Sequence, residues 1–222
     1  MSKARGYKVN KTQNILVICI AAVVFIVSLF VIVKLVKENG FGIETESEAY
    51  QIDRSGKNYD IIISNMTDRL FEYKTETWKR VKVIHDIVAQ GYKYTKNGYD
   101  NADDLTFYGE GNDRALSELF KDLCKGCGID CDVVDGYKDK FQTERKTKWS
   151  WNAVYIDNDV YFVDVTMDMA NNDYDLFLLC YDDMNGKGYD MKKYKEISSV
   201  TDANYEIYRT TLKPEKIEFI GE

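Results

Sequence analysis

The sequence has little proline, a single histidine and no excess of basic side chains. Its 222 residues include 1 Pro and 1 His, and 30 Lys and Arg stand against 37 Asp and Glu, which gives a net charge of −7 at pH 7. So little proline excludes a Pro-rich, low-complexity stalk. The single histidine has no second imidazole with which to form a zinc site, and we expect neither a metal nor a cofactor. No basic patch is present to neutralise phosphates, which argues against a nucleic-acid partner.

The stretch 15–33 contains no charged residue. As a helix rising about 1.5 Å per residue it would be about 28 Å long, close to the hydrocarbon thickness of a bilayer. A cleavable signal peptide is the alternative, but the following segment 33–37 (Val-Lys-Leu-Val-Lys) offers no small-x-small cleavage site. Four basic residues precede the stretch and favour a cytoplasmic N-terminus: Lys3, Arg5, Lys8 and Lys11.

These features predict a single-pass protein of the cell membrane. Residues 1–14 are expected to be a cytoplasmic tail, 15–36 a transmembrane signal anchor, 37–50 a linker and 51–222 a domain outside the cytoplasm. The membrane is therefore the first expected partner.

Apolar periodicity predicts helices in the first half of this domain. We expect one helix over 59–73, a second starting near Thr75 or Thr77, and a third over 114–125 with Asp113 as its N-cap. The polar stretch 95–112 is predicted to be a loop. Strands are predicted over 129–134, 176–181, 205–208 and 216–220.

The stretch Trp149–Asp168 is predicted to contain two strands joined by a tight turn. Asp157 and Asn158 are turn formers between β-branched and aromatic runs. With a two-residue turn, Trp151 lies opposite Asp164, and Trp149 lies diagonal to Asp164 on the same face. The pattern therefore places two indole rings and one carboxylate on one surface of a hairpin.

This hairpin resembles the second half of a transglutaminase-like domain, a family related to papain. The family pattern is His-x-Trp-Asn followed by Asp-x-Thr, and this chain has Trp149-Ser-Trp-Asn152 and then Asp164-Val-Thr166. Gly128-Ile129 and Val134-Asp-Gly136 match the pattern after the family's catalytic helix. The resemblance implies an α+β, papain-like fold in which N-terminal helices pack on an antiparallel sheet, here preceded by one transmembrane helix.

The same resemblance implies a degenerate catalytic triad. Counting back from Gly128 places Asp113 where the family has its nucleophilic cysteine, and Trp149 stands where it has its histidine. A carboxylate cannot replace a thiolate in acyl transfer at neutral pH, because its acyl adduct would be a labile anhydride. An indole N–H only donates, so Trp149 cannot act as an acid or a base. We therefore expect no catalytic residues at these positions.

The remaining candidates for chemistry are the histidine and the cysteines. His85 lies on an amphipathic helix with no nucleophile nearby in sequence, so we expect it to be packed or on the surface. Cys19 falls within the predicted span, and Cys124, Cys127, Cys131 and Cys180 are expected to be packing residues. A disulfide from Cys180 to one of the other three is the alternative, given the expected location.

The sequence therefore predicts a binding or assembly module rather than an enzyme. The ligand-binding candidates are Asp113, Trp149, Trp151 and Asp164, and the expected partner is a peptide or a protein, such as a cell-wall peptide carrying an amine. Two alternatives stay open. One is an active hydrolase or acyl transferase of the superfamily, and the other is a cell-wall hydrolase that uses Asp113 and Asp164 as a carboxylate pair.

Overall fold

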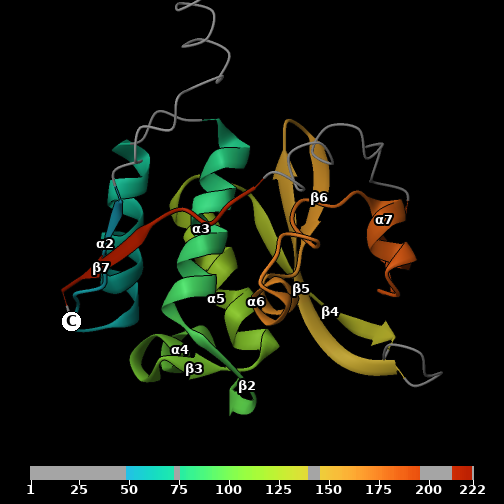
Figure 1. Cartoon of the computed structure of the whole chain (residues 1–222), viewed down its shortest axis with the longest axis horizontal. Coiled ribbons are helices and arrows are strands. Elements are labelled where there is room, and N and C mark those ends of the chain that lie inside the picture. The colour runs from blue at the N-terminus through green and yellow to red at the C-terminus, as the bar shows by residue number, and fades with distance from the viewer. Residues whose placement is uncertain (1–48, 73–75, 140–145, 196–211, 222) are drawn as a thin grey trace, which may run out of the picture. The chain divides into compact units, whose positions relative to one another are not determined.

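A computed structural model of the chain describes residues 49–72, 76–139, 146–195 and 212–221 (Figure 1). All of them belong to one compact unit, Glu48–Glu222. The predicted span 15–36 and the predicted strand 205–208 lie outside the described residues. No helix in the described part is both long enough and apolar enough to cross a bilayer.

The helices and strands follow one another in mixed order, as expected of an α+β domain. In chain order they are β1 (Tyr50–Asp53), α2 (Tyr59–Glu72), α3 (Thr77–Gly91), β2 (Lys93–Tyr99), α4 (Ala102–Tyr108), β3 (Glu110–Gly111), α5 (Asp113–Gly126), β4 (Cys131–Asp139), β5 (Lys146–Ile156), β6 (Asp159–Val163), α6 (Val165–Asn171), α7 (Tyr181–Gly186), the short 3-10 helix η1 (Lys192–Tyr194) and β7 (Ile217–Ile220).

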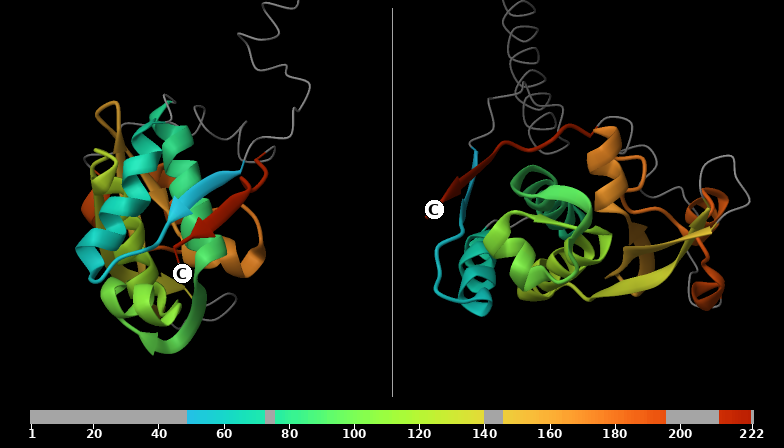
Figure 2. Two further views of the ribbon diagram at one scale, coloured as in Figure 1. Left: turned by 90° about the vertical axis from the view of Figure 1, so that its left-hand side faces the viewer. Right: turned by 90° about the horizontal axis from the view of Figure 1, so that it is seen from below.

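Helix α5 forms the centre of the larger core because it is apolar on the faces that meet its neighbours. Its fully buried side chains are Ala115, Leu116, Leu119, Phe120 and Leu123, as the predicted helical period requires. The helix packs against α2 and α3 on one side and against β4 and β5 on the other (Figures 1 and 2). The N-terminus of α5 is thereby fixed next to the sheet.

The central sheet is antiparallel and ordered β4-β5-β6. Asp157 and Asn158, with φ of 52° and 70°, form the two-residue turn between β5 and β6. Asn152 pairs with Val163 and Ile156 with Asp159, so the predicted register is confirmed. Strand β6 ends at Val163, whereas β5 continues back to Lys146. Among the described residues, one edge of the first half of β5 is therefore left without a neighbouring strand.

Two predicted connections are wrong. The stretch 95–112 is not a plain loop, because it contains part of β2 and the helix α4, whose Ala102 and Leu105 are buried in the core. The predicted strand 176–181 makes only an isolated bridge, Phe162 to Leu179, before α7 begins. By contrast, β7 confirms the strand predicted over 216–220, and it pairs in parallel with β1.

Candidate functional site

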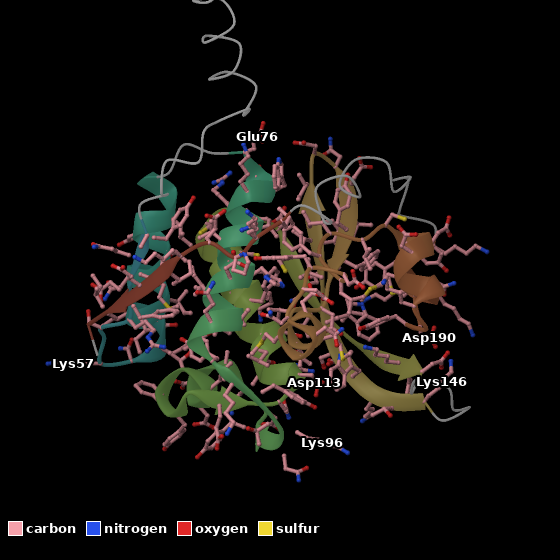
Figure 3. The ribbon with its side chains drawn as sticks, viewed as in Figure 1. Lys57, Glu76, Lys96, Asp113, Lys146 and Asp190 are labelled. Carbon is pink, nitrogen blue, oxygen red and sulfur yellow. The ribbon has the colours of Figure 1, made fainter. Side chains whose placement is uncertain are left out.

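Asp113 lies at the N-terminus of α5, where the helical part of the domain meets the sheet (Figure 3). It is not the N-cap predicted from the sequence, because Asn112 caps the helix by accepting a hydrogen bond from the backbone N–H of Ala115 at 3.1 Å. The Oδ2 of Asp113 instead accepts the backbone N–H of Ser150 at 2.7 Å. That N–H lies on the edge of β5 that β6 does not cover, so Asp113 joins α5 to the strand that carries Trp149.

Trp149 is half-buried, and its indole Nε1 donates a hydrogen bond to Oδ2 of Asp164 at 2.7 Å. The same oxygen accepts the hydroxyl of Tyr189, and Oδ1 accepts the backbone N–H of Met167 at 3.0 Å. Burial raises the pKa of Asp164, and the hydrogen bond from Tyr189 and the charge of Lys138 oppose this rise. The indole thus occupies the donor position that an imidazole would take, without an atom that can accept a proton.

Trp151 lies in the core and not on the surface of a cleft. Its side chain is 0% exposed, and its ring packs edge-on against Tyr189 with centroids 5.1 Å apart. A Cβ at Gly136 would lie 2.5 Å from this ring, which explains a glycine at that position. We therefore leave Trp151 out of the surface that a ligand could contact.

Two further side chains border Trp149, and neither was singled out from the sequence. The ring of Tyr94 lies 5.8 Å from that of Trp149, and burial together with the charges of Asp113 and Asp164 raises the pKa of Tyr94. The Nζ of Lys138 lies 5.6 Å from the centre of the Trp149 ring. Burial lowers the pKa of Lys138, while the charge of Asp164 opposes this shift. The site is therefore a mixture of aromatic rings, two carboxylates and one ammonium.

The cysteines of the described part offer no substitute nucleophile. Cys124, Cys127, Cys131 and Cys180 are buried free thiols, which confirms their prediction as packing residues and leaves the disulfide from Cys180 unformed. Burial raises the pKa of Cys127 to about 11 and also raises the pKa of Cys124 and Cys180. A raised pKa removes thiolate at neutral pH and so removes reactivity.

A second polar cluster, the His85 network, lies inside the helical part of the domain. Its members are Lys82, His85, Asp86, Asp168, Tyr174 and Glu215. His85 is 2% exposed, and its Nδ1 and Nε2 donate to Asp86 and Asp168, each at 3.2 Å. Of the two placements that the sequence left open for His85, packed or on the surface, the structure shows the packed one, and its partners were not predicted.

Asp86 connects three segments of the chain in this network by accepting four hydrogen bonds. Its Oδ1 accepts His85 and the hydroxyl of Tyr174, and its Oδ2 accepts Nζ of Lys82 at 2.9 Å and the backbone N–H of Glu215 at 2.8 Å. The Nζ of Lys82 also lies 3.0 Å from Oε1 of Glu215. The segment that leads into β7 is thereby fixed to α3.

The charges in the network follow from these contacts. Burial alone would lower the pKa of His85, but its hydrogen bonds to Asp168 and Asp86 outweigh burial and raise the pKa to about 9. Burial raises the pKa of Asp168 to about 6, against the hydrogen bond from His85. Burial also raises the pKa of Asp86, but the hydrogen bond from His85 and the positive charges of His85 and Lys82 outweigh burial. The pKa of Asp86 therefore lies below its usual range. At neutral pH an imidazolium therefore lies between two carboxylates.

A small cavity of about 100 Å³ adjoins this network. It is lined by His85, Asp86, Asp168, Tyr174 and neighbouring residues of α3, α6 and the C-terminal segment. The oxygens of Asp86 and Asp168 that face His85 are already engaged, and no group of three or more His, Cys, Asp or Glu in the described ranges could hold a metal ion. The network joins α3 to α6 and to the segment that precedes β7.

The sequence did contain one sign of this network. Lys82, His85 and Asp86 recur at helical spacing within a stripe of apolar residues on α3, and all three are buried. Charged groups on a buried face require partners, because an isolated buried charge is costly. The partners themselves come from distant segments and could not be named from the sequence.

The comparison with protein families agrees with this geometry. Residues 64–165 match the family model of the transglutaminase-like superfamily, and the matched range contains Asp113, Trp149 and Asp164. Residues 64–165 are therefore similar to a transglutaminase-like domain, and the described residues have an α+β fold. A comparison with curated proteins finds no match.

Solved structures with partial similarity come from bacterial proteins, among others. One is a candidate cysteine protease from Cytophaga hutchinsonii, with 18% identity, a TM-score of 0.44 and coverage of 57% of this chain and 40% of that chain. A protein described as a TGase has 14% identity, a TM-score of 0.40 and coverage of 60% and 37%. A candidate protease from Parabacteroides distasonis has 9% identity, a TM-score of 0.36 and coverage of 48% and 23%. The chain thus matches less than half the length of each.

Proposed function

We propose that this chain is a membrane-anchored, extracytoplasmic pseudoenzyme of the transglutaminase-like superfamily that works as a binding or assembly module. The hydrogen bond from Trp149 to Asp164 carries the proposal. It keeps the position of the family's histidine next to its aspartate while supplying neither an acid nor a base. Asp113 is likewise engaged with Ser150 and is not free to attack a carbonyl.

The expected ligand is a peptide that carries an amine, such as a cell-wall stem peptide or the tail of a partner protein. Aromatic rings and carboxylates together favour a cation over a neutral group. Asp113, Trp149 and Tyr94 are the half-buried groups that such an amine could reach, and Lys138 shows that an ammonium is tolerated beside the Trp149 ring. A carboxylate-pair hydrolase is disfavoured, because Asp164 is 1% exposed and both its oxygens accept hydrogen bonds.

Catalytic silence is tested on the full chain by an electrophile that labels thiols, with each cysteine followed by mass spectrometry. We expect no labelling of the four buried cysteines under native conditions and complete labelling after unfolding. Asp113→Cys alone should give no turnover, because nucleophile and base act as a unit. Asp113→Cys combined with Trp149→His is the matched variant in which thiol alkylation and slow ester hydrolysis are expected. Stoichiometric labelling of one native cysteine, with matching loss of a measurable activity, would overturn the pseudoenzyme proposal.

Location is tested separately by adding protease to spheroplasts. We expect residues beyond about 40 to be digested while a tag on the N-terminus is spared, as a cytoplasmic N-terminus requires. Protection of the whole domain would contradict the outward orientation without affecting the proposal of catalytic silence.

A further inference from the structure

Three exposed aromatic side chains lie on α4 and at the end of β2, and two of them, Tyr99 and Tyr108, are in contact. Tyr99, Phe107 and Tyr108 are 39%, 52% and 63% exposed. Within the described ranges the other large hydrophobic side chains exposed to this degree are Ile61 and Tyr137. Contiguous exposed apolar surface on a soluble domain commonly marks an interaction site. We call these three residues the aromatic platform.

Local contacts hold the platform in its observed arrangement. The rings of Tyr99 and Tyr108 are stacked, with centroids 4.6 Å apart and an interplanar angle of 14°. Asn101 caps α4 by accepting the backbone N–H of Asp104 at 2.9 Å, and Gly109 ends the helix with a φ of 76°. Because the rings are already ordered, a partner would lose little side-chain entropy on binding them.

The charge around the platform is negative. Asp103 and Asp104 lie four residues before Phe107 and Tyr108, so each shares a helix face with one aromatic ring. Asp100 adds a further exposed carboxylate. The face of a tyrosine ring also carries negative potential, so rings and carboxylates together attract a cation.

Basic residues offset this charge only in part. Lys93 of β2 already faces Glu110 at 3.8 Å, and Lys96 lies at the lower end of β2 (Figure 3). The platform lies outside the degenerate triad but is joined to it, since the backbone N–H of Asn112 donates to the carbonyl of Tyr99 at 2.8 Å. A segment bound here would lie at the same edge of the domain as Asp113.

We propose that the aromatic platform docks a cationic segment of a partner protein, in which an arginine or lysine stacks on Tyr108 and a neighbouring apolar side chain packs on Phe107. Arginine fits best, because its planar guanidinium stacks on an aromatic ring while its N–H groups reach a carboxylate. Charge complementarity selects this partner over an anionic lipid surface. The aromatic platform does not include the residues of the proposed degenerate triad. The docking proposal would therefore stand even if the triad variants proved active.

The test measures binding of a labelled ten-residue peptide of alternating Leu and Arg to the full chain in nanodiscs of zwitterionic lipid. A peptide with citrulline in place of Arg is the neutral control. We expect the Arg peptide to bind more tightly than the citrulline peptide. Tyr108→Ala should weaken binding roughly threefold to fivefold, as loss of one exposed cation–π contact predicts. Combining it with Phe107→Ser should weaken binding about tenfold.

Tyr137→Ala is the matched control, because Tyr137 is an exposed tyrosine of β4 outside the platform, and it should leave binding unchanged. Unchanged thermal unfolding of each variant would show that the fold is kept. Equal binding of the citrulline peptide, or equal loss in Tyr137→Ala, would overturn the proposal. Displacement of the Arg peptide by a peptidoglycan disaccharide would identify a sugar-stacking surface instead. Preferential binding of anionic over zwitterionic vesicles, lost in the Phe107→Ser variant, would identify a lipid contact and also overturn the proposal.

Discussion

The triad positions and the His85 network differ in how they hold charge. At the triad positions, Asp113 and Asp164 accept hydrogen bonds from neutral donors, which are a backbone N–H, an indole and a phenol. In the His85 network, the carboxylates of Asp86 and Asp168 face a charged imidazolium. Burial raises the pKa of both triad aspartates, whereas the cations around Asp86 lower its pKa.

The two sites therefore differ in the kind of donor that their carboxylates meet, which is neutral at the proposed triad positions and charged in the His85 network. The triad positions connect α5, β5 and α6, and exchanging one neutral donor for another there should cost little. In the His85 network, Lys82 and His85 share Asp86, and each has only one further carboxylate partner there, Glu215 for Lys82 and Asp168 for His85. Removing one member of a buried ion pair leaves an uncompensated charge, which is far more costly than losing a neutral hydrogen bond.

The largest effect is expected from Asp86→Ala. This change leaves the buried ammonium of Lys82 and the imidazolium of His85 without their shared acceptor, and it should lower the free energy of unfolding by about 3–5 kcal/mol. Urea denaturation measures the loss, with Asp100→Ala as an exposed aspartate control. A loss below about 1 kcal/mol would show that the network does not stabilise the domain.

The pH dependence of stability should report the same network. The pKa of His85 rises from 6.5 to about 9 on folding, so its contribution is present below pH 6.5 and is lost as the pH rises through 9. The free energy of unfolding should fall by about 3 kcal/mol over this window. The raised pKa of Asp168, about 6, acts in the same direction between about pH 4 and 6.

The chain has 1 His, so this window reports on a single imidazole. Thermal unfolding at a series of pH values measures the slope, and His85→Gln should flatten it between pH 6.5 and 9 while leaving the region below pH 6 sloped. A slope that persists in His85→Gln would assign the pH dependence to other groups.

A smaller effect is expected at Trp149. Trp149→Phe keeps an aromatic ring, although a smaller one, and removes the donor to Asp164, and loss of that hydrogen bond should cost about 1 kcal/mol. Trp149→His should lower the free energy of unfolding by less than Trp149→Phe does, because an imidazole can donate a hydrogen bond to the same oxygen of Asp164. Denaturation of the two variants side by side checks this order. Equal stability of Trp149→Phe and the parent chain would remove the structural reason for an indole at this position.

The smallest effects distinguish Asn112 from Asp113. Asn112→Ala should cost about 1 kcal/mol because it removes the N-cap of α5. Asp113→Asn should change stability by less than about 0.5 kcal/mol, since its amide oxygen still accepts the N–H of Ser150. If Asp113→Asn also weakens binding of a lysine-containing peptide while the melting temperature is unchanged, the charge of Asp113 serves recognition. Loss of stability in Asp113→Asn alone would show instead that the charge supports the fold.

The sequence by itself determined the hairpin of β5 and β6. Alternation of apolar residues and the turn-forming pair Asp157-Asn158 fix the register, because a two-residue turn leaves one pairing for the strands. The helical period of α5 likewise follows from the sequence, and the spacing back from Gly128 places Asp113 at the start of this helix. These are local patterns, in which each residue's neighbours along the chain decide its environment.

The tertiary structure alone decided which residue caps α5, which tryptophan is buried and which partners His85 has. Asn112 and Asp113 are both residue types that cap helices well. In the structure Asn112 caps α5, and Asp113 instead accepts the backbone N–H of Ser150, which lies on the part of β5 that β6 does not cover. Trp149 and Trp151 share a face of the strand, but packing against Tyr189 and over Gly136 leaves Trp151 0% exposed, whereas Trp149 is half-buried. His85 contacts Asp168, which lies 83 residues away in the sequence. A buried charge needs an opposite charge beside it, and only the folded chain brings these two residues together.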